Sequence, residues 1–151
     1  MSSLDLIGVA IVYCRVYVNK QSAEAHRRIF HAINEVVFAD TGMYLEWRHI
    51  HSPSLASRVG ILHWVGDQHQ GQAKGLGLFL MDIVQRLEPR LDLHEERLLS
   101  SLSAYEHLHR LFQLCVIHVL QNIEKAPVIN AVKKAMRSLI CLKHEDWDGT
   151  L

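Results

Sequence analysis

The feature that most constrains this chain is an apolar run over residues 59–65 that stops at Gly66 and Asp67. β-Branched residues bounded by glycine are typical of a buried strand. The residues that follow can form a helix, which we expect to reach Arg86, with Pro89 closing it. Asp67 would therefore stand at the carboxyl end of a strand, where ligands and metals gather in open α/β sheets.

The other apolar segments predict an α/β fold with its strands concentrated in the first half of the chain. Residues 6–18 and 44–50 have the Val, Ile and Tyr content or the alternation of strands. Between them, apolar residues recur every three or four positions over residues 23–39. That spacing predicts an amphipathic helix, capped by Ser22 and ended by Gly42.

The second half is expected to be mainly helical. Residues 91–105 are polar and interspersed with leucine, which favours two short helices over a strand. Residues 109–114 form a short apolar piece that predicts a strand. Helices are then expected over residues 115–124 and 128–142, with Pro127 as a break between them.

Composition indicates a globular protein and excludes several classes. The 151 residues are enough for one domain with a core, and Lys plus Arg equals Asp plus Glu, so net charge does not point to nucleic acid. The apolar runs are too short to span a bilayer and no signal peptide opens the chain. Three widely spaced cysteines suit a reducing compartment. We therefore expect an intracellular protein without a membrane partner.

One group of residues has the chemistry of a zinc site. Cys115 and His118 form a Cys-x-x-His pair that can bind one ion from a strand end and the first turn of a helix. His107 or His109 could complete the tetrahedron. The alternative is that Cys115 is a small buried hydrophobe and His118 a hydrogen-bonded helix residue.

Two further patterns concern the region around Asp67. Four histidines are candidates to gather near it at one sheet edge, as metal ligands or as structural residues: His49, His51, His63 and His69. The sequence Gly75-Leu76-Gly77 resembles part of a dinucleotide fingerprint, but the third glycine is missing and the pair lies inside the expected helix. We predict instead that these glycines, with Gly71, let the helix pack closely on a neighbour.

Residues 109–125, HRLFQLCVIHVLQNIEK, resemble the end of the transposase domain of Mutator-like elements (MULE). The family pattern is a short apolar strand, a Cys-x-x-His pair and an apolar helix containing Asn-Ile. Residues 65–73 resemble its second catalytic aspartate at a strand end, followed by a helix. Residues 16–30 resemble its strand that leads into a helix, with Ser22 at the capping serine. The similarity covers most of the chain.

The resemblance implies a fold of the DDE superfamily. We expect a partial ribonuclease-H-like core, α/β in class, with about four or five strands flanked by helices. In a single domain over residues 1–151, the core would span 5–77 and 109–125, with a helical insertion over about 78–108 and C-terminal helices over 127–142.

The resemblance also implies a function. In such a core, three acids hold two Mg²⁺ or Mn²⁺ ions that activate water, and later a DNA 3′-hydroxyl, against a phosphodiester. Asp67 maps to the second acid. The first acid would lie on a strand before Leu6, and the third on a helix beyond Leu151. We therefore expect an inactive fragment of a nuclear DNA transposase, whose intact form binds transposon ends.

A non-catalytic protein-interaction module is the alternative function. In this interpretation the Cys-x-x-His pair binds zinc for stability, and the sheet and helices bind protein partners. In either case, the missing first strand would leave a sheet edge unpaired. An unpaired edge pairs readily with other chains, so we expect self-association.

Overall fold

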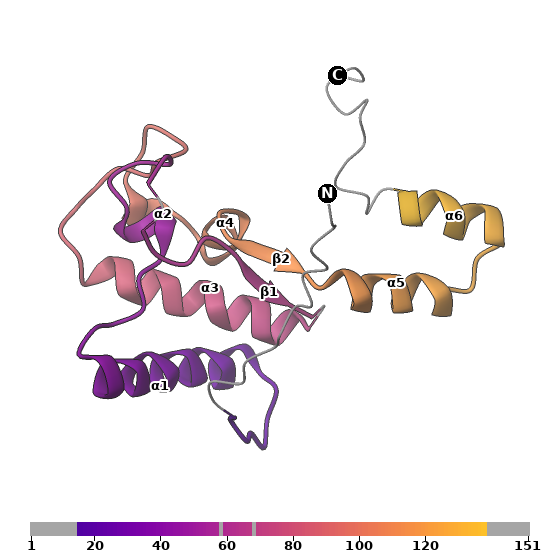
Figure 1. Cartoon of the computed structure of the whole chain (residues 1–151), viewed down its shortest axis with the longest axis horizontal. Coiled ribbons are helices and arrows are strands. Elements are labelled where there is room, and N and C mark those ends of the chain that lie inside the picture. Colours follow the sequence, from indigo (N-terminus) through magenta and orange to yellow (C-terminus); the bar gives the residue numbers. More distant parts are fainter. Residues whose placement is uncertain (1–14, 58, 68, 139–151) are drawn as a thin grey trace, which may run out of the picture.

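The computed structural model describes residues 15–57, 59–67 and 69–138. Its elements in chain order are α1 (Ala23–Thr41), α2 (Arg48–His51), β1 (Trp64–Gly66), α3 (Gln70–Gln85), the 3₁₀ turn η1 (Leu99–Ser101), α4 (Ala104–His109), β2 (Phe112–Leu114), α5 (Val116–Lys125) and α6 (Asn130–Ser138). Figure 1 shows α1 and α3 side by side, and α5 and α6 extending from the end of β2 away from the other helices.

The sheet in the described part of the chain has two strands, and they are parallel. β1 and β2 pair in the register Trp64–Phe112, Val65–Gln113 and Gly66–Leu114. Parallel neighbours need a crossover connection, and α3 with the segment after it supplies one. The expected ribonuclease-H-like core of four or five strands is therefore wrong, because helices dominate the described residues and these residues form one βαβ unit.

The strand predicted over residues 44–50 is also wrong. Only Trp47 makes a bridge, a parallel one with Ile61, and α2 begins directly after it. Trp47 and Ile50, three residues apart, are 0% and 1% exposed. One helical turn buries both side chains on the same face, which an alternating strand would not do. Of the strand predicted over 6–18, residues 6–14 lie outside the described residues, and residues 15–18 form no strand.

The predicted long helices are confirmed, together with their end signals. Ser22 caps α1, since its Oγ accepts a hydrogen bond from the Ala25 N–H at 3.2 Å. Gly42 ends the helix with a left-handed φ of 73°, and its N–H donates to the Phe38 carbonyl at 2.8 Å. The helix predicted after Asp67 is α3.

The glycines of α3 pack against its neighbours as the sequence predicted. A Cβ at Gly75 would lie 2.5 Å from the Cβ of His26 and 2.7 Å from the carbonyl oxygen of Ala23, both in α1. A Cβ at Gly77 would overlap the carbonyl oxygen of Ala104, the first residue of α4. The glycines therefore let α3 contact α1 on one side and α4 on another.

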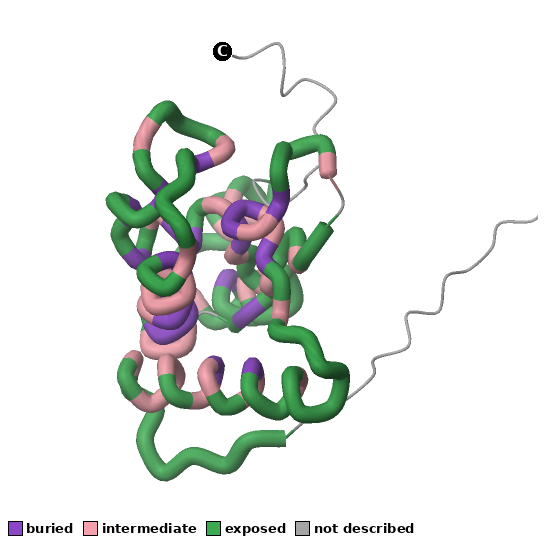
Figure 2. Tube along the Cα trace, turned by 90° about the vertical axis from the view of Figure 1, so that its left-hand side faces the viewer, coloured by how far each residue is buried: buried purple, intermediate pink, exposed green. Residues whose placement is uncertain are grey.

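The core surrounds α3, and Figure 2 shows buried residues on several elements, interspersed with exposed ones along the chain. Aromatic rings connect its layers: Phe30 of α1 lies 5.3 Å from Trp64 of β1, and Phe79 of α3 lies 6.1 Å from Trp47. Within the described ranges, no helix has the length and apolar character needed to cross a membrane.

Candidate functional site

Asp67 follows β1 directly and precedes α3. Its side chain is exposed, and its Oδ1 accepts a hydrogen bond from the His69 N–H at 3.0 Å. His69 in turn caps α3, because its Nδ1 accepts from the Gln72 N–H at 3.2 Å. The sequence thus predicted correctly that Asp67 follows a strand and precedes a helix, although the strand covers Trp64–Gly66 and not the predicted residues 59–65.

A small cavity of about 130 Å³ adjoins this carboxylate. It is lined by Gln21, His26, Asp67, His69 and Gln72, and the rings of His26 and His69 lie 5.3 Å apart. Asp67 is the one carboxylate among these five residues. Two bridged divalent ions need several carboxylates, and no group of three or more His, Cys, Asp or Glu able to hold a metal occurs in the described residues. The described residues therefore do not fit a two-metal centre.

The two sequence motifs meet in space at the end of the sheet. Gly66, the residue before Asp67, pairs in register with Leu114, the residue before Cys115. The Cys115 N–H donates a hydrogen bond to the Gly66 carbonyl oxygen at 2.7 Å. Asp67 and the Cys-x-x-His pair therefore begin at the carboxyl ends of adjacent parallel strands.

The four candidate zinc ligands do not converge. His107 is fully buried in α4 and its Nδ1 lies 3.1 Å from Nε2 of His49. His109 and His118 are exposed, on α4 and α5, and Cys115 is a half-buried free thiol. No three of them form a metal-binding group in the part of the chain that the structure describes. A tetrahedral site needs four ligands around one point, so these side chains as placed do not fit zinc.

The four histidines considered near Asp67 are also dispersed. His69 alone lies beside it. His49 is in the core, the Nδ1 of His51 accepts from the Trp47 N–H at 2.8 Å, and the Nδ1 of His63 lies 3.1 Å from Nε2 of Gln113. These histidines make hydrogen bonds within the fold, which was the structural alternative.

Sequence reasoning missed a buried polar cluster around His49 and His107. Burial lowers the pKa of His49 to about 3 and that of His107 to about 4, so both rings are neutral at pH 7. Nearby, Arg110 donates to the buried Oδ2 of Asp92 at 2.8 Å and to Glu95 at 2.9 Å. These residues come from three separate segments, so no sequence spacing signals the cluster.

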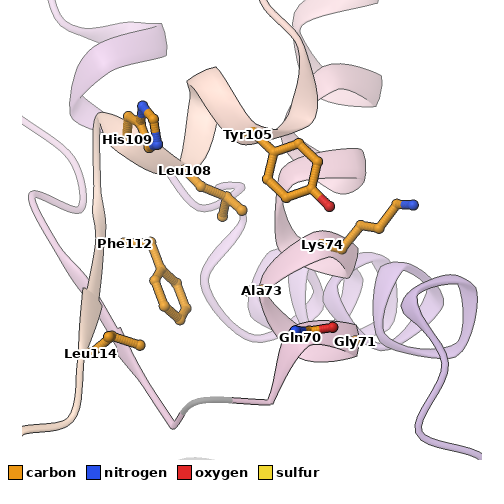
Figure 3. A pocket seen from close by; sticks show the side chains of 9 residues that line it. All are labelled: Gln70, Gly71, Ala73, Lys74, Tyr105, Leu108, His109, Phe112 and Leu114. Carbon is orange, nitrogen blue, oxygen red and sulfur yellow. The ribbon is translucent and has the colours of Figure 1, made fainter. Parts of the chain in front are cut away.

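A wider cavity, of about 680 Å³, lies between α3, α4 and β2. Figure 3 shows Phe112 and Leu114 of β2 on one side, and Tyr105 and Lys74 on the other. Leu108 lies between the two sides. The walls are apolar, and the lining polar side chains include a lysine and a tyrosine, an arrangement that suits an apolar group better than a catalytic reaction.

No family model matches this chain, and no curated protein or solved structure matches it.

Proposed function

We propose that this chain is part of a DDE-type DNA transposase of the Mutator-like class, that it carries the second catalytic acid, Asp67, and that it has no cleavage activity by itself. In this proposal the intact enzyme is nuclear and acts on DNA with divalent metal ions. The described residues supply Asp67, at the end of β1, to the proposed catalytic site. The other two acids of that site would belong to other parts of the protein.

One observation supports the proposal above the others. The two motifs that carry the family resemblance are 48 residues apart, and the hydrogen bond from Cys115 to Gly66, at 2.7 Å, brings them together. A chance resemblance in two separate segments gives no reason for both to begin at neighbouring strand ends. A shared site at the mouth of a sheet does give that reason.

We expect no activity because Asp67 is the one carboxylate among the residues that line its cavity. The other residues that line its cavity are glutamines and histidines, and one carboxylate cannot bridge two ions. We therefore expect the purified chain to leave supercoiled plasmid intact with Mg²⁺ or Mn²⁺, as Asp67→Ala does. Nicking that requires the metal, is lost in Asp67→Ala and survives in Asp40→Ala, a control at the end of α1, would overturn this part of the proposal.

The lineage itself is tested by the flanking genomic sequence. The proposal expects a reading frame that continues upstream into an apolar strand with an acid, and downstream into a helix with a glutamate. Flanks that lack both features would overturn the assignment. This result is independent of the plasmid assay, because it does not depend on the activity of the purified chain.

A second function, protein interaction, is favoured by α5 and α6. These helices pack mainly on each other, and of their residues only Ile123 is buried. Ile117 of α5 and Ile129, which directly precedes α6, are 65% and 71% exposed, and Figure 1 shows both helices away from the α1–α3 layer. Exposed apolar side chains on a projecting helical pair are typical of a surface that associates with another protein.

A further inference from the structure

A third cavity, of about 340 Å³, lies on the side of the molecule formed by α2, the approach to β1 and the segment before α4. It collects basic side chains from four separate segments. Its lining residues are Arg48, His49, Leu55, Leu62, His63, His94 and Arg110. None of them lines the cavity beside Asp67, so the two sites are distinct.

Several nitrogen atoms of the residues that line this cavity are buried and have no hydrogen-bond partner among the described residues. They are Nε of Arg48, Nδ1 of His49 and Nε of Arg110. No hydrogen bond or ion pair engages the Arg48 side chain within the described ranges, and His49 is 4% exposed. Buried polar groups are nearly always satisfied by a protein group, water or a ligand. The unpaired atoms therefore call for an acceptor in or beside the cavity.

His49 can offer its Nδ1–H as a hydrogen-bond donor to a ligand because its other ring nitrogen contacts His107. Both rings of the His49–His107 pair are neutral, so the pair holds two N–H groups, and one of them is used in the 3.1 Å contact. If His107 donates from Nδ1, the remaining proton is on Nδ1 of His49, the unpaired atom. An acceptor in the cavity selects this tautomer.

The two arginines that line the cavity differ in whether an acid neutralises them. Arg110 is neutralised by Asp92 and Glu95, at 2.8 and 2.9 Å, and those two acids are the anionic groups bonded to a lining residue. Arg48 has no acidic partner among the residues that the structure describes, so within them it contributes an uncompensated positive charge. The exposed rings of His63 and His94 add further nitrogen atoms at the rim.

We propose that this cavity binds a small phosphate monoester, with the phosphate against Arg48 and the histidines and the organic group against Leu55 and Leu62. A carboxylate has two oxygens, whereas a phosphate offers three terminal oxygens and nearly two charges to an arginine and several imidazoles. The volume exceeds what a phosphate alone fills and lies in the range of small-ligand sites. The two leucines supply the apolar wall for the remainder of the ligand.

Calorimetric titration with phenyl phosphate and with inorganic phosphate tests this assignment on the full chain. We expect saturable binding of both, with phenyl phosphate tighter because its ring contacts the leucines. Arg48→Gln is expected to weaken both at least about tenfold, the loss of one charge-assisted pair. Equal affinities for the two probes, or no saturable binding of either, would overturn the proposal.

Two further variants separate binding from folding. His94→Gln changes an exposed side chain and is expected to weaken phosphate binding without changing the melting temperature. Arg28→Gln, an exposed arginine of α1, is the matched control and is expected to bind as the wild type does. Equal losses in Arg48→Gln and Arg28→Gln would show that only net charge matters, and would overturn the site.

Discussion

His49 and His107 lie against each other in the core, with Nε2 of one 3.1 Å from Nδ1 of the other. Their exposed fractions are 4% and 0%. The unfolded chain exposes both rings to water, where a histidine has a pKa of 6.5, while in the fold the pKa values are about 3 and about 4. At pH values between the folded and the unfolded pKa of each histidine, the unfolded state therefore binds more protons than the folded state.

Stability is accordingly expected to fall as the solution becomes acidic. Below pH 6.5 the unfolded chain gains protons that the folded chain does not take up, so the free energy of unfolding decreases as the pH is lowered toward about 4. Each histidine contributes a loss of about 2 kcal/mol between pH 7 and pH 5. Urea unfolding across this range measures it.

The control for this prediction is the double variant His49→Gln/His107→Gln, whose stability should depend much less on pH in the same window. If that variant does not fold, ring-nitrogen chemical shifts of the wild type measure the two pKa values directly. An unfolding midpoint that stays constant from pH 7 to pH 5 would contradict the prediction.

This pair also shows where sequence reasoning stops. The caps of α1, the position of Asp67 and the close-packing glycines of α3 depend on neighbouring residues or on one residue type, and all were predicted. The contact of His49 with His107 joins residues 58 positions apart and has no local signal. Residues 44–50 were mistaken for a strand because a short apolar run does not by itself distinguish a strand from a helical turn, and the burial of both Trp47 and Ile50 on one face is set by the core.

A second prediction concerns Gly75. Alanine is the better helix former, by about 1 kcal/mol, so an isolated helix would gain from Gly75→Ala. In this fold the added methyl would lie 2.5 Å from the Cβ of His26, and α1 and α3 must separate. We expect a net loss of about 1–3 kcal/mol in urea unfolding. Gln85→Ala, at the exposed end of α3, is the control. A Gly75→Ala variant with a higher free energy of unfolding than the wild type would contradict the close packing of α1 and α3.

A third prediction concerns Asp82, which joins the same two helices. Arg27 donates to both of its carboxylate oxygens at 2.6 Å, and Nε2 of His31 donates at 2.8 Å. Burial alone would raise the pKa of Asp82, but these hydrogen bonds outweigh it and the pKa is lowered. Asp82→Asn should lower the free energy of unfolding by about 1–2 kcal/mol, a modest value because Arg27 is partly solvated.

The control for Asp82 is Glu24→Gln. Glu24 contacts Arg27 and Arg28 at 3.4 and 3.2 Å, but its side chain is 53% exposed. Exposed ion pairs contribute little, so this variant should lose less than about 0.5 kcal/mol. Equal effects of the two substitutions would mean that the ion pair between α1 and α3 does not hold the helices together.

The last prediction is that the chain self-associates, and the choice of variant tells which surface is responsible. Burying exposed isoleucines such as Ile117 and Ile129 against a second copy gains up to about 1.5–3 kcal/mol per side chain. Ile117→Glu should then shift light-scattering mass toward the monomer, because burying a charge opposes association. If the unpaired sheet edge is responsible instead, Val65→Lys on β1, where the side chain is 60% exposed, will have the larger effect. A wild-type chain that is monomeric at every concentration would exclude both surfaces as sites of self-association.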